Sequence, residues 1–269
     1  MLHSVKALDG FAIAATDGQL GKVKDIYFDD LKWTIRYLEV DTGRWLTGRR
    51  VLISPISVAS IDWPRATINV RLTRQQVNDS PGIDTAKPVS LQHETALSNY
   101  YGYPYYWSGP YLWGYTVFPS LADQALLEEL EREAARETME KDNTPDEDPH
   151  LRSKDEVVGY RIEATDDTVG HVEDFLFDEK DWSILLMVVD TREWWPGKHV
   201  LISPRRIRQV SWEDKSVVVD VTRKQIESSP EYDGKHPPGR EDYEEVYRPY
   251  QRPVPPAAAT ADRKSGGAP

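Results

Sequence analysis

Short apolar runs alternate with polar residues along residues 10–72, and turn signals separate the runs. Asp17-Gly18 and the polar run from Asp29 to Lys32 are the clearest of these signals. Several short strands bounded by regularly spaced turns are typical of a β-barrel or β-sandwich. The sequence therefore predicts strands at 11–16, 23–29, 33–41, 51–54, 57–63 and 67–72.

The same pattern returns later in the chain. Residues 10–84 align with residues 159–233 without a gap, at an offset of 149, and about 30 of the 75 pairs are identical. The match includes Val51-Leu52-Ile53-Ser54-Pro55, which returns as Val200-Leu201-Ile202-Ser203-Pro204. The chain thus contains the same domain twice, and because two copies are too few for a solenoid, each copy is expected to have its own core.

Each copy ends with a short predicted helix. Thr73 and Gln76, like Thr222 and Gln225, fit the capping box of a helix start, and Ser-Pro follows each helix. We therefore divide the chain into a first copy (1–89), an intervening part (90–149), a second copy (150–233) and a tail (234–269). The tail is rich in Pro, Ala and charge and is expected to be disordered.

The intervening part holds ten aromatic residues within residues 100–118. Interleaved Gly and Pro predict a loop. Its rings either join the two copies, or form an exposed patch for a protein partner, or offer a stacking surface to sugar or membrane. A helix is predicted from Ser120 to about Glu140, followed by an acidic linker at 142–149. The aromatic residues are Tyr100, Tyr101, Tyr103, Tyr105, Tyr106, Trp107, Tyr111, Trp113, Tyr115 and Phe118.

The two copies differ in one directed way. Polar Arg36, Glu39 and Asn69 of the first copy correspond to Leu185, Val188 and Val218 of the second. The strand at 184–189 is therefore apolar on both faces, which is typical of a strand covered on both sides. We expect the intervening part or a partner to cover the second copy.

Charge and composition exclude several classes of protein. The net charge is −12, with +2 in residues 1–89 (12 basic, 10 acidic) and −9 in residues 90–149 (3 basic, 12 acidic), so nucleic-acid binding lacks a basic footprint. The chain has no cysteine, which excludes disulfides, thiolate zinc sites and thiol catalysis. No apolar run is long enough for a membrane span, and the N-terminus lacks signal-peptide features, so a soluble cytoplasmic protein is expected.

Candidate chemistry is sparse. The carboxylates shared by both copies are expected to cap turns, although a proton relay is conceivable. The histidines are dispersed along the sequence, so we expect no metal site. The sequence has no glycine-rich phosphate loop, so we expect no nucleotide or other cofactor. The shared carboxylates are Asp25, Asp29 and Asp41, with Asp174, Asp178 and Asp190.

The joint motif resembles the PRC-barrel family. It comprises Gly21-x-Val-x-Asp-x-x-Phe-Asp, the Trp33 strand, the stretch from Val40 to Pro55 and the terminal Thr-Arg-x-Gln-x-x-x-Ser-Pro. This small antiparallel barrel is named for the photosynthetic reaction centre, where it forms the cytoplasmic part of one polypeptide, and it also forms the C-terminal domain of a ribosome-maturation factor. The second copy departs from the motif where Arg192 replaces Gly43.

The resemblance implies two six-stranded antiparallel barrels and a bacterial-type, non-enzymatic adaptor or scaffold with an unidentified protein partner. The alternative is an accessory component of a photosynthetic or redox complex, similar to that reaction-centre polypeptide, which uses surface carboxylates for proton transfer. We expect barrels that exchange no strands and touch as a pseudo-twofold pair. The sequence is also compatible with association of several chains into a homo-oligomer. Residues 100–118 are expected to pack on the second barrel and expose some rings to the partner.

Overall fold

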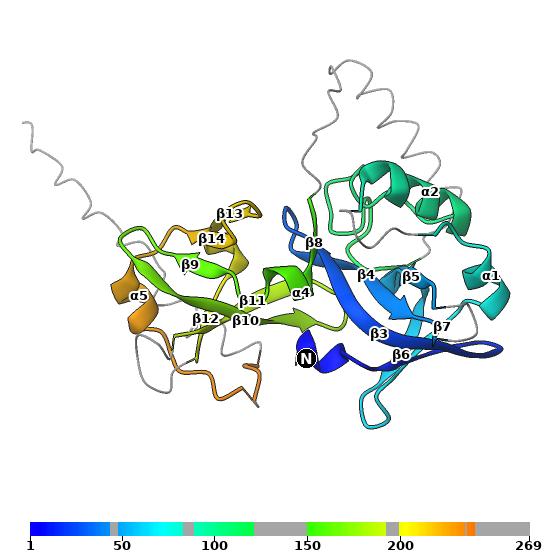
Figure 1. Ribbon diagram of the computed structural model, residues 1–269, viewed down its shortest axis with the longest axis horizontal. Coiled ribbons are helices and arrows are strands. Elements are labelled where there is room, and N and C mark those ends of the chain that lie inside the picture. The colour runs from blue at the N-terminus through cyan, green and yellow to red at the C-terminus, as the bar shows by residue number, and fades with distance from the viewer. Residues whose placement is uncertain (44–47, 83–88, 121–149, 192–198, 235, 240–269) are drawn as a thin grey trace, which may run out of the picture.

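The computed structural model describes residues 1–43, 48–82, 89–120, 150–191, 199–234 and 236–239. Each copy forms a curled sheet, and the two sheets lie side by side (Figure 1). The first sheet has the order β5-β4-β3-β2-β7-β6, and the second has the equivalent order β12-β11-β10-β9-β14-β13. Within both, all pairings are antiparallel except β2–β7 and β9–β14, which are parallel.

The predicted strands of the first copy are confirmed, with ends that shift by at most two residues except in β3, which begins at Gly18 rather than Val23 and so includes most of the predicted turn. Its strands are β2 (Ala12–Ala15), β3 (Gly18–Asp29), β4 (Thr34–Asp41), β5 (Arg50–Ile53), β6 (Val58–Asp62) and β7 (Thr67–Val70). Those of the second copy are β9 (Arg161–Glu163), β10 (Thr168–Asp178), β11 (Ile184–Asp190), β12 (His199–Ile202), β13 (Ile207–Ser211) and β14 (Ser216–Val219). The 3-10 turns η3 (Pro55–Ser57) and η4 (Pro204–Arg206) link β5 to β6 and β12 to β13.

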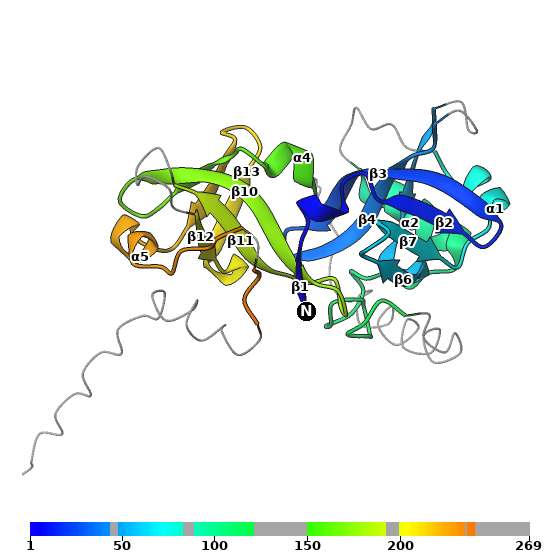
Figure 2. The ribbon, with the colours of Figure 1, turned by 90° about the horizontal axis from the view of Figure 1, so that it is seen from below.

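A seventh strand enters each sheet from the other copy. β1 (Leu2–Ser4) pairs with β10, and β8 (Leu151–Ser153) pairs with β3 (Figures 1 and 2). The two registers are equivalent, with Leu2 opposite Asp178 and Leu151 opposite Asp29. The prediction that the copies exchange no strands is therefore wrong.

The length of β3 and β10 explains the exchange. β2 pairs with β3 only as far as Lys22, so the backbone groups of Tyr27 to Asp29 on that edge have no partner within their own copy. Unpaired backbone groups at a sheet edge are costly when buried. The short strand of the other copy satisfies them, and after each exchanged strand comes one helical turn, η1 (Lys6–Leu8) or α4 (Lys154–Val157).

A reciprocal contact joins the starts of β4 and β11. The Ile35 N–H donates to the Trp182 carbonyl at 2.9 Å, and the Ile184 N–H donates to the Trp33 carbonyl at 2.7 Å. Both tryptophans have positive φ angles, 49° and 62°, which are uncommon for bulky side chains. The prediction that the copies touch is confirmed, and reciprocal pairs of this kind are typical of a pseudo-twofold relation.

The hydrophobic core continues from one copy into the other, so the expectation of one separate core per copy is wrong. The Phe28 and Phe175 rings, one from each copy, lie next to each other at the junction, with centroids 5.2 Å apart. A shared core of this size stabilises both small domains, since each alone buries only a modest fraction of its surface.

Different segments cover the outer faces of the two sheets. In the first copy, α2 (Leu91–Tyr101) lies beside β4 and β5 (Figure 1). Its Leu97 side chain packs with Tyr37 and Leu52 of these strands. In the second, Leu2 and Tyr232 cover the outward-facing Leu176, Leu186, Val188 and Leu201.

The two predicted capping boxes are present, at Thr73 before α1 (Arg74–Asn78) and at Thr222 before α5 (Arg223–Glu227). Residues 121–140 of the predicted helix, the acidic linker, Arg192 and most of the tail lie outside the described residues. Across the described ranges, no helix has the length and apolar character needed to span a bilayer.

Candidate interaction site

The aromatic segment, defined as residues 100–118, begins in a helix that the sequence did not predict. Tyr100 and Tyr101 are the last residues of α2, which Ser90 caps and Gly102 ends with a φ angle of 66°. Beyond Gly102 the backbone is irregular, as the interleaved Gly and Pro predicted. Short bridges pair Tyr111 with Gly114 and Trp113 with Thr116.

One lysine anchors the segment to the first copy. Lys32 lies in the turn between β3 and β4, and its Nζ donates to the carbonyls of Tyr106, Gly109 and Tyr111 at 3.0, 2.9 and 2.7 Å. Burial lowers the pKa of Lys32, but three carbonyl acceptors stabilise its ammonium. The ammonium therefore fixes the loop backbone at three points.

A buried arginine supplies the second anchor. The Arg36 side chain of β4 is fully buried and donates to Asp29 at 2.8 Å and to the Leu112 carbonyl at 2.5 Å. Its guanidinium carbon lies 3.8 Å from the centre of the Tyr106 ring and 4.9 Å from the Trp113 ring. A buried charge is costly without such partners. The loop therefore stabilises the buried Arg36 guanidinium through a carbonyl acceptor and two aromatic rings.

The prediction that the segment packs on the second barrel is therefore wrong. Leu185 occupies the Arg36 position in the second copy and requires no polar cover. The apolar strand β11 is covered instead by Leu2 and Tyr232, which the alternation pattern did not reveal.

The segment nevertheless contacts both copies. Trp113 is only 1% exposed, and its Nε1 donates to the Asp181 carbonyl of the second copy at 2.9 Å. Asp181 is the equivalent of Lys32 at the offset of 149, so the segment binds the same turn in each copy. These contacts support the interpretation that part of the segment joins the copies.

Glu94 links α2 to this cluster. The Tyr106 hydroxyl donates to the Glu94 carboxylate at 2.7 Å, and the buried Tyr37 ring lies against the same group. Burial raises the pKa of Glu94 to about 7, although both phenols and the Arg36 charge act to lower it. The contact between helix, strand and loop therefore contains a carboxyl group that titrates near neutral pH.

Part of the segment faces outward. We define the exposed rim as Leu31, Tyr111, Val117 and Phe118; Tyr111 and Phe118 are each 53% exposed. Beside Phe118 is a hollow of about 240 Å³, lined by β6 of the first copy and by Trp182 of the second. Tyr100 is also exposed, whereas Tyr101, Tyr103, Tyr105, Tyr106, Trp107 and Tyr115 are partly buried.

Three of the shared carboxylates cap turns, as predicted. Asp29 accepts from the Leu31 N–H at 2.8 Å, Asp178 from Lys180 at 3.0 Å and Asp41 from Gly43 at 2.8 Å. Asp29 also pairs with Arg36, which the repeat did not predict.

Asp25 and Asp174 hold the exchanged elements instead. Asp25 accepts from the Ser153 hydroxyl and from the Asp155 N–H, and Asp174 accepts equivalently from Ser4 and Lys6. Burial raises the pKa of Asp25 to about 6. Within the described ranges, no three His, Asp or Glu side chains converge in a metal-binding arrangement.

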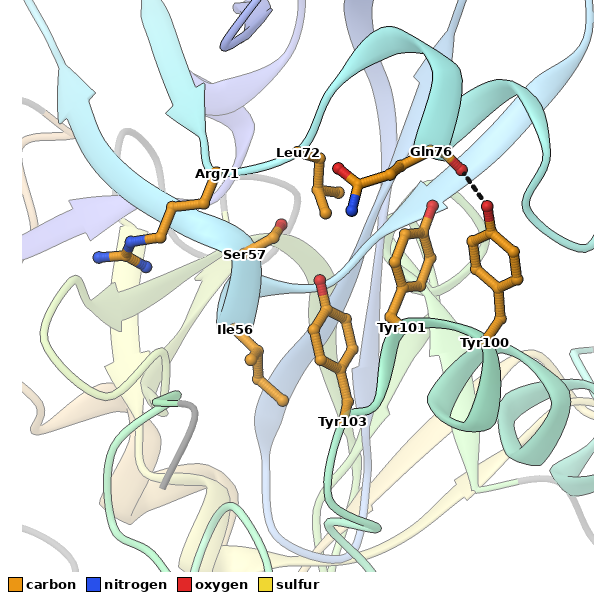
Figure 3. A pocket seen from close by; sticks show the side chains of 8 residues that line it. All are labelled: Ile56, Ser57, Arg71, Leu72, Gln76, Tyr100, Tyr101 and Tyr103. Carbon is orange, nitrogen blue, oxygen red and sulfur yellow. Dashed lines mark hydrogen bonds between the residues drawn. The ribbon is translucent and has the colours of Figure 1, made fainter. Parts of the chain in front are cut away.

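A separate pocket of about 330 Å³ lies beside the start of the segment (Figure 3). Tyr101 and Tyr103 stack with ring centroids 5.2 Å apart, and their hydroxyls point the same way, towards Leu72 and Gln76. Tyr100 closes one side by donating to the Gln76 carbonyl at 2.8 Å. The other lining residues are Ile56, Ser57 and Arg71.

Two curled sheets that exchange their first strands around a shared core define a tandem of small β-barrel domains. The PRC-barrel domain model matches residues 4–72 and 152–226, which is more than half of the chain. The chain therefore belongs to the PRC-barrel family. No curated protein matches it in a sequence comparison.

Proposed function

We infer that this protein is a non-enzymatic adaptor that presents the exposed rim to a protein partner. The observation that carries the proposal is the anchoring of an aromatic loop at the junction of two interlocked copies. Because Lys32, Arg36 and Trp113 already fix its backbone, little loop entropy is lost on binding. Aromatic side chains in such a setting are the residue types that dominate protein interfaces.

The family and the carboxylates bear on the choice between an adaptor and a proton-transfer component. PRC-barrel domains often mediate protein interactions. Asp25 and Asp174, two equivalent buried carboxylates beside the exchanged strands, bind elements of the other copy. They thus have a structural task within the chain, which favours the adaptor over the alternative of proton transfer through surface carboxylates.

The test is affinity capture with the full chain carrying Tyr111→Ser and Phe118→Ser, quantified against the unaltered chain. We expect the captured partner to fall at least about tenfold with thermal stability nearly unchanged, because both side chains are exposed. Leu91→Ser is the matched control, since Leu91 is 51% exposed but lies outside the rim. Equal capture by all three proteins, or equal loss in the control, would contradict the proposal.

A further inference from the structure

One end of the second sheet is an open strand edge. β13 is the last strand in the order of that sheet and lies at the upper margin of the second copy (Figure 1). It pairs with β14 from Ile207 to Ser211. On its other side, neither a strand nor an isolated bridge pairs with it in the ranges that the structure describes. The backbone N–H and C=O groups along such an edge can pair with an added strand.

Three arginines lie at the start of this edge. Arg205 and Arg208 are exposed, and 65% of the Arg208 side chain is accessible. Asp220 pairs with Arg206 at 3.6 Å and lies 4.0 Å from Arg208, whereas Arg205 has no ion-pair partner among the described residues. The acidic residues 213–214 follow the opposite end of the strand, so the positive charge is concentrated at its start.

The first copy does not have this charge. Arg71 stands at the position of Asp220 and donates to the Val58 carbonyl of β6 at 2.7 Å, so its own side chain occupies a backbone acceptor of the equivalent strand. Phe118 also borders β6 across the hollow of about 240 Å³. The positive edge is therefore a property of the second copy and not of the shared fold. The residues at the positions of the three arginines are Ile56, Ser57 and Ala59.

An extended acidic polypeptide fits both features of this edge. A polypeptide supplies the backbone donors and acceptors that an open edge can pair with, whereas a nucleic acid does not. Arginine binds carboxylates through two parallel charge-assisted hydrogen bonds. A nucleic acid would also meet a chain of net charge −12, with only a few arginines to neutralise its phosphates.

We propose that β13 binds an acidic segment of another protein, which adds to the sheet as an extended strand and places carboxylates on Arg205 and Arg208. In this mode of recognition, main-chain hydrogen bonds supply affinity and side-chain contacts supply specificity. Neither arginine belongs to the exposed rim, so this inference does not depend on the proposed function.

The test is fluorescence anisotropy of a labelled peptide of about ten residues that alternates glutamate and threonine, titrated with the full chain. We expect saturable binding at one site per chain, and at least about tenfold weaker binding of the peptide with lysine in place of glutamate, because like charges then meet. Arg205→Gln with Arg208→Gln is expected to weaken binding of the acidic peptide about tenfold. Arg65→Gln is the matched control, since Arg65 is 83% exposed in the turn between β6 and β7 of the first copy.

Two N-methylated versions of the acidic peptide separate strand addition from charge attraction. One carries methyl groups on the odd amides and the other on the even amides. Because only one set of amides faces β13, one version should bind at least about tenfold more weakly than the other. An oligonucleotide of similar length and charge tests a different class of anion.

Several outcomes would overturn the proposal. It is wrong if the acidic peptide shows no saturable binding, and the arginines then only keep an open edge from pairing with other chains. It is also wrong if the lysine peptide or both methylated peptides bind as tightly as the acidic peptide. Tighter binding of the oligonucleotide, or unchanged binding by the Arg205 and Arg208 double variant, would overturn it as well.

Discussion

Buried charges distinguish the two copies at the scale of single residues. Arg36 and Glu39 of the first copy are almost fully buried and find partners in Asp29 and Arg50, whereas the second copy has Leu185 and Val188 at these positions. The sequence identified this difference because the repeat aligns the positions. It did not identify the loop partners of Arg36, which lie about 70 residues away or more in a segment without periodicity.

Glu94→Gln tests the buried carboxyl group. The pKa of Glu94 is raised to about 7 in the folded chain, so its contribution to stability is fully present below the unfolded value and is lost as pH rises from about 4.5 through 7. The folded chain should therefore lose up to about 3 kcal/mol of unfolding free energy over this range through Glu94 alone. The glutamine variant lacks this loss, so it gains stability relative to the unaltered chain as pH rises.

Urea denaturation at pH 5, 6, 7 and 8 measures this difference. Asp25 adds a slope of the same sign in both proteins, because its pKa is also raised, so only the difference between variant and unaltered chain reports on Glu94. The exposed Glu213→Gln serves as the control. A difference that does not change with pH would contradict the assignment.

At the scale of elements, the sequence predicted what repeats and missed what is short. Apolar runs, turn signals and the capping boxes identified the six strands and the terminal helix of the first copy, and the alignment of residues 10–84 with 159–233 gave their equivalents in the second, including the three-residue β9. β1 and β8 have three residues each and show no alternation, and their partners are in the other copy. Pairing of that kind depends on which edge of β3 or β10 lacks a partner, and a local pattern does not contain this information.

Leu2→Ala and Leu151→Ala form a matched pair that tests the exchange. Leu2 is buried with Leu176 and Leu186 of the second copy, and Leu151 is buried with Tyr27 and Tyr37 of the first. Each change is expected to cost about 2–4 kcal/mol, as for other buried leucines. Its effect should appear in the sheet of the opposite copy.

Hydrogen exchange locates the effect. In Leu2→Ala the amides at 175–178 of β10 should exchange faster than in the unaltered chain, while those at 26–29 of β3 stay protected. Leu151→Ala should show the reverse. Faster exchange in β2 and β3 after Leu2→Ala would mean that the first strand stabilises its own copy.

At the scale of the whole molecule, four kinds of contact join the duplicated chain into one unit, in addition to the reciprocal hydrogen bonds between β4 and β11. These are the exchanged strands, the Asp25 and Asp174 bonds, the fused core around Phe28 and Phe175, and the aromatic segment that contacts the same turn in each copy. The sequence revealed the duplication and predicted that the copies touch, but it indicated separate cores and no exchanged strands, because self-similarity does not report which residues of one copy contact the other.

A protease site inserted between Asn143 and Thr144 tests this unity. After complete cleavage the two fragments are expected to elute together at the size of the intact protein and to unfold in one thermal transition, since each sheet contains a strand from the other fragment. Light scattering after gel filtration and calorimetry give these readouts. Asp25→Ala with Asp174→Ala is the comparison variant: loss of both acceptors leaves partly buried hydroxyl and amide donors without these partners, which costs about 1 kcal/mol per site. The cleaved variant should therefore separate at lower urea concentration than the cleaved unaltered protein, whereas fragments of the unaltered protein that elute apart without denaturant would show that the copies are independent domains.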